Sequence, residues 1–152
     1  MRYEFDCGPR RLLAAALVAG LTVAAGCSEP APLPGPKPTP VSGSVVYQGR
    51  PAVGFRVALH PAQPWEGAQF APSATTDAEG KFQVHSYREN DGAPPGEYVV
   101  TFTWPQEVRS GDPDDAPRIV DRLRGKFSDP RRSEFSATVE NGENMLDPFV
   151  LK

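Results

Sequence analysis

Apolar and polar residues alternate along much of this chain with a period of two, which is the pattern of β-strands that bury one face. The clearest run follows a Pro-Pro-Gly turn at residues 94–96. One face of this run carries large apolar side chains, and the other carries Val99, Thr101 and Thr103. The large side chains are Tyr98, Val100, Phe102 and Trp104. We therefore expect a central strand here and an all-β protein around it.

The same alternation predicts six further strands. They cover residues 41–48, 55–60, 74–76, 82–85, 135–139 and 149–151. In the second of these stretches Phe55, Val57 and Leu59 form the buried face. Because successive side chains of a strand point to opposite faces, Arg56 and His60 should point outward.

Turn-forming residues separate the expected strands. The D-A-E-G sequence at residues 77–80 predicts an Asx-type turn in which Gly80 has a positive φ. The N-G pair within residues 141–144 predicts a hairpin that leads into the last strand. Pro148 cannot donate a backbone hydrogen bond, so the last strand should lie at a sheet edge or contain a bulge.

One segment, residues 115–125, departs from this alternation. Asp115 is a suitable helix N-cap, Ile119 and Leu123 are four residues apart, and Gly125 suits a helix C-terminus. We therefore expect one short helix in an otherwise all-β chain.

The composition fits this fold class. The chain of 152 residues contains 18 prolines and 14 glycines, which suits short strands joined by tight turns. Residues 41–152 are close in length to the roughly 100 residues of a two-sheet β-sandwich, so one folded domain is expected there. The net charge of −3 argues against a nucleic-acid partner, which would require a basic surface.

The first residues have the features of an export signal. Arg10 and Arg11 precede an apolar run at residues 12–25, which is too short for the roughly 17–25 residues of a membrane-spanning helix. The A-A-G-C sequence that ends at Cys27 resembles a bacterial lipobox, with Ala24 in place of the usual leucine. Residues 1–26 are therefore expected to be a lipoprotein signal peptide. Ordinary secretory cleavage and a retained membrane anchor are the alternatives.

The cysteines support the lipoprotein interpretation. Cys7 would be removed with the signal peptide, which leaves Cys27 as a lone thiol without a disulfide partner. The resemblance to lipoproteins implies that Cys27 carries lipid, and two or three acyl chains anchor a protein durably. Residues 27–40 then form a linker, because alternating prolines favour an extended polyproline II spacer of about 3.1 Å per residue. The folded domain should thus lie outside the cytoplasm in the cell envelope, attached to the membrane.

Several short motifs, in this order, resemble the carboxypeptidase regulatory-like or transthyretin-like β-sandwich of small bacterial envelope lipoproteins. They are V-S-G-S-V-V-Y-Q-G-R-P-A-V-G at residues 41–54, T-D-A-E-G-K-F at 76–82, P-P-G-E-Y-V-V-T-F at 94–102, L-R-G-K-F-S-D-P at 123–130 and V-E-N-G-E-N at 139–144. The resemblance implies a seven-stranded Greek-key sandwich of prealbumin type. It implies neither shared catalytic residues nor a particular ligand.

His60 and His85 are the only histidines, and both are expected to point outward from strands. They would be the catalytic residues if the chain were a transthyretin-like hydrolase or another small-molecule enzyme. The hydrolases of this fold end in Tyr-Arg-Gly-Ser, whereas this chain ends in Phe149-Val150-Leu151-Lys152. We therefore expect a protein without catalytic residues, without a metal site and without a cofactor.

Basic residues gather in the expected helix and just after it. Four of them form a candidate site for an anionic glycan or lipid headgroup: Arg118, Arg122, Arg124 and Lys126. The alternative is a solvated surface. Trp65 and Phe70 lie in a loop, where they either stack on carbohydrate or cap the end of the core.

These observations predict a non-catalytic, membrane-anchored envelope lipoprotein that presents a β-sandwich as an interaction or structural module. Its expected partners are the membrane, through Cys27, and an envelope polysaccharide or protein. We expect the domain to be a monomer.

Overall fold

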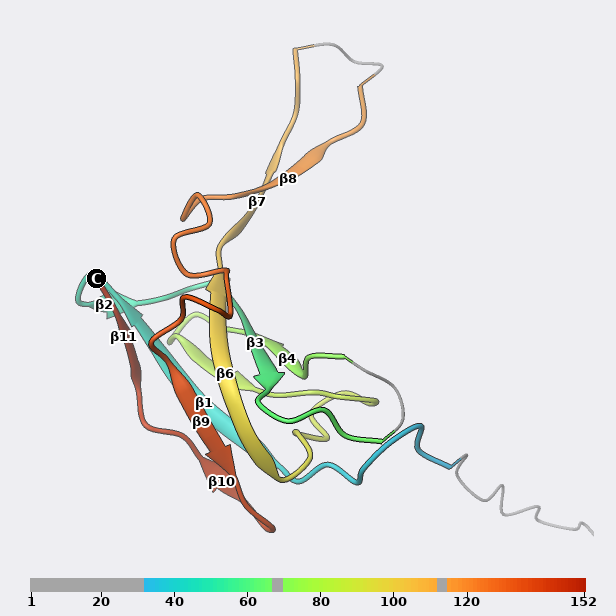
Figure 1. Ribbon diagram of the computed structural model, residues 1–152. Helices are drawn as coiled ribbons and strands as arrows, with labels where there is room; N and C mark the ends of the chain where they lie inside the picture. The colour runs from blue at the N-terminus through green and yellow to red at the C-terminus, as the bar shows by residue number, and fades with distance from the viewer. Residues whose placement is uncertain (1–31, 67–69, 112–114) are drawn as a thin grey trace, which may run out of the picture. The chain divides into compact units, whose positions relative to one another are not determined.

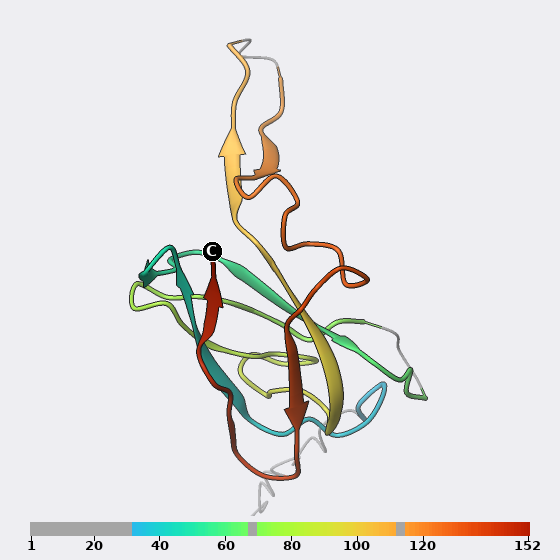
Figure 2. The same cartoon turned by 60° about the vertical axis from the view of Figure 1, so that its left-hand side comes forward.

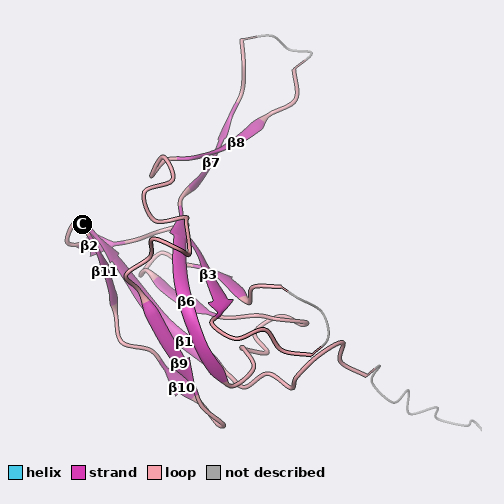
Figure 3. Cartoon of the chain, in the orientation of Figure 1, coloured by secondary structure: helices cyan, strands magenta, loops and turns pink. Residues whose placement is uncertain are grey.

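The structure, a computed structural model, describes residues 32–66, 70–111 and 115–152. These residues form strands, turns and loops without any helix (Figure 3). The all-β prediction is therefore confirmed for the described part of the chain. Eleven strands are present there rather than the expected seven, because two strands of only two residues and a two-stranded ribbon were not anticipated.

The first sheet is built around strand β1 (Val41–Tyr47). Two antiparallel strands pair with one side of β1, namely β2 (Arg50–Pro51) and β5 (Lys81–Gln83). Two parallel strands pair with β1 as well, namely β10 (Asn144–Met145) and β11 (Phe149–Leu151). The first and last strands of the domain are thus direct neighbours (Figure 1).

A bulge interrupts the C-terminal edge of this sheet. Val41 is opposite Asn144, whereas Val45 is opposite Phe149, so four steps along β1 correspond to five along the C-terminal segment. The extra residue falls beside Pro148, which cannot take part in the ladder as a donor. The prediction of an edge strand or a bulge at Pro148 is therefore confirmed.

The second sheet is antiparallel throughout, in the order β4-β3-β6-β9. Its strands are β4 (Ser73–Thr75), β3 (Arg56–Pro61), β6 (Gly96–Thr103) and β9 (Ser136–Val139). The longest ladder joins β3 to β6, from Arg56 opposite Thr103 to Pro61 opposite Tyr98. Arg56 is exposed and His60 is half-buried on the outer face, as the alternation predicted.

The two sheets enclose one apolar core. Phe149 of the first sheet contacts Phe102 of the second, with 5.3 Å between ring centroids. Val57, Leu59 and Val100 are completely buried, and each such side chain contributes about 1.5–3 kcal/mol through removal of apolar surface from water. The residues predicted to face the core on β3 and β6 do so, with Trp104 packed at its margin.

A tight turn joins β4 to β5 as the D-A-E-G sequence predicts. The Asp77 carboxylate accepts hydrogen bonds from the backbone N–H groups of Glu79 and Lys81, at 3.0 and 2.8 Å. Gly80 has a φ of +74°, and an added Cβ there would lie 2.6 Å from the Val45 carbonyl oxygen. Glycine is therefore required at this point, because the turn packs directly against the backbone of β1.

The predicted helix at residues 115–125 is wrong. Its residues form β8 (Arg118–Asp121), which pairs with β7 (Pro105–Val108), followed by a series of turns. This two-stranded ribbon projects away from the two sheets in both orientations (Figures 1 and 2). Ile119 is 68% exposed, so it does not form a helical apolar stripe with the buried Leu123.

The hairpin expected at residues 141–144 is also wrong. β9 pairs with β6 in the second sheet, whereas β10 pairs with β1 in the first. The turn itself is held by Asn144, whose side chain accepts from the Glu140 N–H at 2.9 Å and donates to the Gly142 carbonyl at 2.9 Å. It carries the chain from one sheet to the other instead of reversing it within one sheet.

Candidate functional site

A groove of about 970 Å³ lies on the outer side of β1 and β5. Because Val41, Val45 and Phe82 point into the core, the alternating residues of these strands face the groove. The outward side chains are Ser42 and Ser44 of β1 with Lys81 and Gln83 of β5. A volume of this size is typical of small-molecule sites.

The remaining walls of the groove come from three other segments. On the C-terminal side they are Met145, Leu146, Asp147 and Pro148, where the bulge interrupts the edge strand. On the opposite side they include Thr75, Asp77 and His85, with Glu89 and Asn90 of the following loop. A smaller hollow of about 130 Å³ shares Ser42, Gln83 and Asn90 with the groove and leads toward Asn144.

The loop at residues 86–91 owes its shape to Asp91. The Asp91 carboxylate accepts backbone hydrogen bonds from Ser86 at 2.7 Å, from Tyr87 at 3.1 Å and from Arg88 at 2.9 Å. Asn90 has a φ of +57°, a conformation that asparagine tolerates better than most residues. This compact turn holds Glu89 and Asn90 at the rim of the groove.

The two histidines lie in different places and have different partners. The Nε2 atom of His60 is 2.9 Å from the Thr101 hydroxyl oxygen, on the outer face of the second sheet. The Nε2 atom of His85 is 3.3 Å from the Ser73 hydroxyl oxygen, and His85 lines the groove. Partial burial lowers the pKa of His60, because desolvation disfavours its charged form.

The four candidate polyanion residues are spread over the ribbon and the turns after it. Arg118 is exposed on β8, opposite Val108. The Arg122 guanidinium lies 3.6 Å above the centre of the Trp104 ring, a cation–π contact that ties it to the protein. Arg124 is exposed in a turn with a φ of +52°, and the Lys126 amine donates to the Lys152 carbonyl. They do not share one helical side, because the helix is absent.

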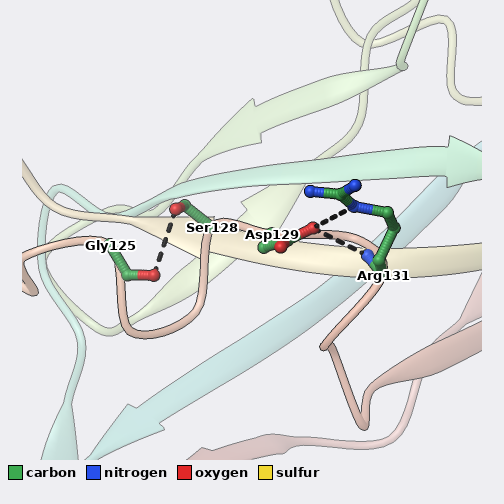
Figure 4. Close-up of polar contacts among 4 residues, drawn as sticks. All are labelled: Gly125, Ser128, Asp129 and Arg131. Atoms are coloured by element: carbon green, nitrogen blue, oxygen red, sulfur yellow. Dashed lines mark hydrogen bonds and ion pairs between the residues drawn. The ribbon is translucent and has the colours of Figure 1, made fainter.

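In the turns at residues 125–131, polar side chains form hydrogen bonds and an ion pair with neighbouring groups of the same segment (Figure 4). The Ser128 hydroxyl donates to the Gly125 carbonyl at 3.1 Å, and Asp129 accepts from the backbone N–H and the Nε of Arg131 at 3.0 and 3.3 Å. The backbone hydrogen bond from Arg131 lowers the pKa of Asp129, with help from the guanidinium. One basic side chain that follows the four candidate residues, Arg131, is thus already paired with Asp129.

The aromatic residues of the loop pack against one another and against the domain. The Trp65 ring is 5.5 Å from that of Phe70 and 6.2 Å from that of Tyr98, and Phe70 is 5.1 Å from Tyr87. Of the two roles considered for Trp65 and Phe70, these contacts favour capping of the core.

The last part of the proline-rich segment also contacts the domain. Thr39 exchanges two backbone hydrogen bonds with Ala93, at 2.9 and 3.0 Å. Its hydroxyl oxygen lies 3.0 Å from the Glu140 carbonyl oxygen, to which it donates. The linker therefore joins the fold before residue 41, and the span expected for a free spacer of residues 27–40 is shortened at this end.

Several expectations concern residues outside those described. Cys27, the whole of residues 1–26 and the start of the linker belong to this group. Within the described residues, no helix is long and apolar enough to cross a membrane. Among the same residues, no three histidine, cysteine, aspartate or glutamate side chains gather as metal ligands.

Apart from His85, the groove residues were not selected by sequence reasoning, although the alternation placed several of them correctly. Alternation along the strand expected at residues 82–85 places Lys81, Gln83 and His85 on the face opposite the buried Phe82 and Val84, and the structure does the same. The sequence does not reveal that β1 pairs with both β5 and the C-terminal segment. This pairing brings the groove residues together from distant parts of the chain.

No family model matches the chain, and no curated protein matches it by sequence. Among solved structures, it is similar to a 9R-lipoxygenase from Cyanothece PCC8801, with 11% identity and a TM-score of 0.43 over 76% of this chain and 16% of the lipoxygenase. A DUF3823 family protein from Parabacteroides merdae shares 13% identity with a TM-score of 0.36, over 74% of this chain and 45% of that protein.

A third solved structure is described as a putative carbohydrate binding protein from Pseudomonas aeruginosa. It shares 14% identity with a TM-score of 0.40, over 75% of this chain and 88% of that protein. This chain therefore spans less than half the length of the first two of these proteins and most of the third.

Proposed function

We propose that this chain is a lipid-anchored module of the cell envelope that binds a partner in the groove across β1 and β5. The observation that carries the proposal is the groove itself, with a volume of about 970 Å³ and polar side chains from several segments around it. Such a concave site, formed on a paired sheet, suits recognition by side chains. The module acts by binding and carries out no reaction.

The separation of the two histidines supports a role in binding. Each imidazole is within hydrogen-bonding distance of a hydroxyl oxygen on a different strand, and only His85 lines the groove. An acid–base pair needs both groups within reach of one substrate. The groove is also a better candidate than the basic residues of the ribbon, because Arg122 and Lys126 are already engaged within the protein.

The architecture that best fits this proposal is a carboxypeptidase regulatory-like or transthyretin-like Greek-key sandwich. Two sheets around one core, with the expected turn at residues 77–80, support it. In this proposal, residues 1–26 are the signal peptide, residues 27–40 are the lipidated cysteine and linker, and residues 41–152 are the binding domain. The domain acts as a monomer outside the cytoplasm, on a polysaccharide or protein of the envelope.

The anchor is tested by labelling cells that express the full chain with radioactive palmitate. We expect the wild-type chain to be labelled and the Cys27→Ser chain to remain unlabelled, because the sulfur of Cys27 is the attachment point. Cys7→Ser is the matched control and should be labelled like the wild type. Label that persists in Cys27→Ser contradicts the proposed anchor.

A further inference from the structure

The position of the groove restricts what can bind in it. β1, which forms its floor, is paired with β5 and β2 in one direction and with β10 and β11 in the other. Most of its backbone N–H and C=O groups are therefore used within the sheet. A peptide that extends a sheet relies on free backbone groups at an edge. A ligand across the face of β1 must instead be recognised by side chains.

The charges around the groove disfavour a polyanion. Asp77, Glu89 and Asp147 contribute three carboxylates, against the single ammonium group of Lys81. The Asp77 carboxylate is held by two backbone N–H groups in its turn. Phosphate-rich or sulfated chains would meet repulsion here, since complementary potentials are needed for charged partners.

The polar side chains suit a ligand rich in hydroxyl groups. Gln83 and Asn90 each present an amide with donors and an acceptor, and Ser44 adds a hydroxyl. Carboxylates accept strong hydrogen bonds from hydroxyl groups, so Glu89 and Asp147 extend the set. Within the described residues, these five side chains make no hydrogen bond or ion pair to the protein.

An apolar strip completes the groove. Met145 is 84% exposed and Pro148 is exposed on the same wall, whereas Leu146 between them packs against the core. Gly43 has no side chain, which leaves room for Leu146 and Phe82 to lie close to β1. The apolar wall offers a contact for the C–H face of a sugar ring, while the amides and carboxylates reach its hydroxyls.

We propose that the groove binds a neutral oligosaccharide, which lies across β1 and β5 between the Asn90 loop and the Met145 wall. This proposal rests on the proposed function and specifies its ligand. Lys81 and Gln83 donate to sugar hydroxyls, Glu89 and Asp147 accept from them, and Met145 with Pro148 contacts the ring. Binding of this kind depends little on salt, because the ligand has no charge.

The test is a titration of the ¹⁵N-labelled full chain, observed by amide NMR spectra. The probes are neutral hexasaccharides of glucose and of N-acetylglucosamine, together with a sulfated oligosaccharide and a lysine-rich hexapeptide. We expect a neutral hexasaccharide to shift the amide signals of residues 42–44, 81–83 and 145–148. The shifts should persist when ionic strength rises from about 0.01 M to 0.15 M, over which the Debye length falls from about 30 Å to 8 Å.

Three variants test whether any loss of binding comes from the groove itself or from a general effect on the fold. Ser44→Phe places a ring in the groove from an outward position of β1, and Gln83→Ala removes one amide. Each should weaken binding at least about tenfold, the effect of losing one or two well-placed hydrogen bonds. Ser136→Phe introduces the same ring on the exposed side of β9 and should leave binding unchanged.

The possible results distinguish an incorrect ligand from an incorrect proposed function. If no neutral hexasaccharide shifts the groove signals, or if only the sulfated probe or the peptide does, the proposed ligand is wrong. Binding of the chain to isolated cell-envelope material then decides the proposed function. Loss of that binding in Ser44→Phe but not in Ser136→Phe retains a groove-binding module with another ligand, whereas equal binding of all three proteins contradicts both proposals.

Discussion

A single glycine can determine how closely two segments that are distant in the sequence approach one another. Gly92 has a φ of +90°, and a Cβ added there would lie 1.7 Å from the carbonyl oxygen of Thr39. The same oxygen accepts a hydrogen bond from Ala93. Gly92 therefore allows the end of the proline-rich segment to pair with the domain, a role quite different from that of a flexible hinge.

We predict that Gly92→Ala separates Thr39 from Ala93 and destabilises the fold by about 2–4 kcal/mol, the range of steric and backbone effects at special positions. Urea unfolding of the purified chain measures the change. Gly49→Ala is the matched control, because Gly49 has a φ of +76° but nothing within 4 Å of an added Cβ. It should cost only about 1–2 kcal/mol for the left-handed backbone. Equal costs for both variants would contradict the steric explanation.

His60 provides a prediction about pH. Its pKa in the folded state is lowered by desolvation, so the unfolded chain binds a proton more readily than the folded chain. As pH falls below the ordinary histidine value of about 6.5, this difference should reduce the free energy of unfolding, and the loss should level off below the folded pKa.

The measurement is urea unfolding at pH 7.5 and pH 5.0 for the wild type and for His60→Gln, which retains a hydrogen-bonding side chain toward Thr101. The wild type should lose more stability over this interval than the variant does. A larger loss in His60→Gln would show that the sign of the effect is wrong.

At the scale of elements, the ribbon of β7 and β8 depends on one carboxylate at its base. Asp121 Oδ1 accepts from the backbone N–H groups of Trp104 at 2.7 Å and Leu123 at 3.0 Å, and its Oδ2 accepts from Gly125 at 2.9 Å. A two-stranded ribbon is marginally stable alone. These three contacts connect it to the end of β6 and to the buried Leu123.

We predict that Asp121→Ala destabilises the chain by about 2–3 kcal/mol, since hydrogen bonds to charged acceptors are worth about 1.5–3 kcal/mol each and the site is partly exposed. Proteolysis of residues 105–121 should become faster at the same time. Asp115→Ala removes the same charge from an exposed position and should change neither result measurably. A stable, protease-resistant Asp121→Ala protein would contradict this account of the ribbon.

The ribbon also explains where sequence reasoning failed. The spacing of Ile119 and Leu123 fits a helix, but Ile119 and Val120 are β-branched and therefore also favour a strand. Their partner strand lies across a loop, so no local pattern reveals the pairing. The strands around Val57 and Val100 were predictable because burial of one face imposes a strict alternation on the sequence.

The candidate site was predictable only in part for the same reason. Alternation places Lys81 and Gln83 on the outer face without information about any other segment. It does not indicate that Met145 and Asp147 reach the same groove, because that depends on the parallel pairing of the C-terminal segment with β1. The chemistry of individual residues was therefore visible, whereas their assembly into a site was not.

At the scale of the whole molecule, one sheet contributes most of the long ladders and the other carries the groove. The β4-β3-β6-β9 sheet supplies most of the long antiparallel ladders and many of the completely buried side chains, among them Val57, Leu59 and Val100. The sheet around β1 is built from shorter partners and carries the groove. Substitutions on the outer side of β1 should therefore affect the proposed binding while the other sheet preserves the fold.

The pairing of β1 with the C-terminal segment also imposes an order on folding. The Ser42 hydroxyl donates to the carbonyl of Asn144, which lies 102 residues further along the chain. Because residues 1–26 are proposed to direct export, the domain folds after it has crossed the membrane, and β1 waits there until the C-terminal segment has followed it. Val41 and Val45, which are buried in the finished protein, remain open to chaperones during that interval. The edge of β1 that pairs with β10 and β11 is therefore among the last parts of the domain to be covered.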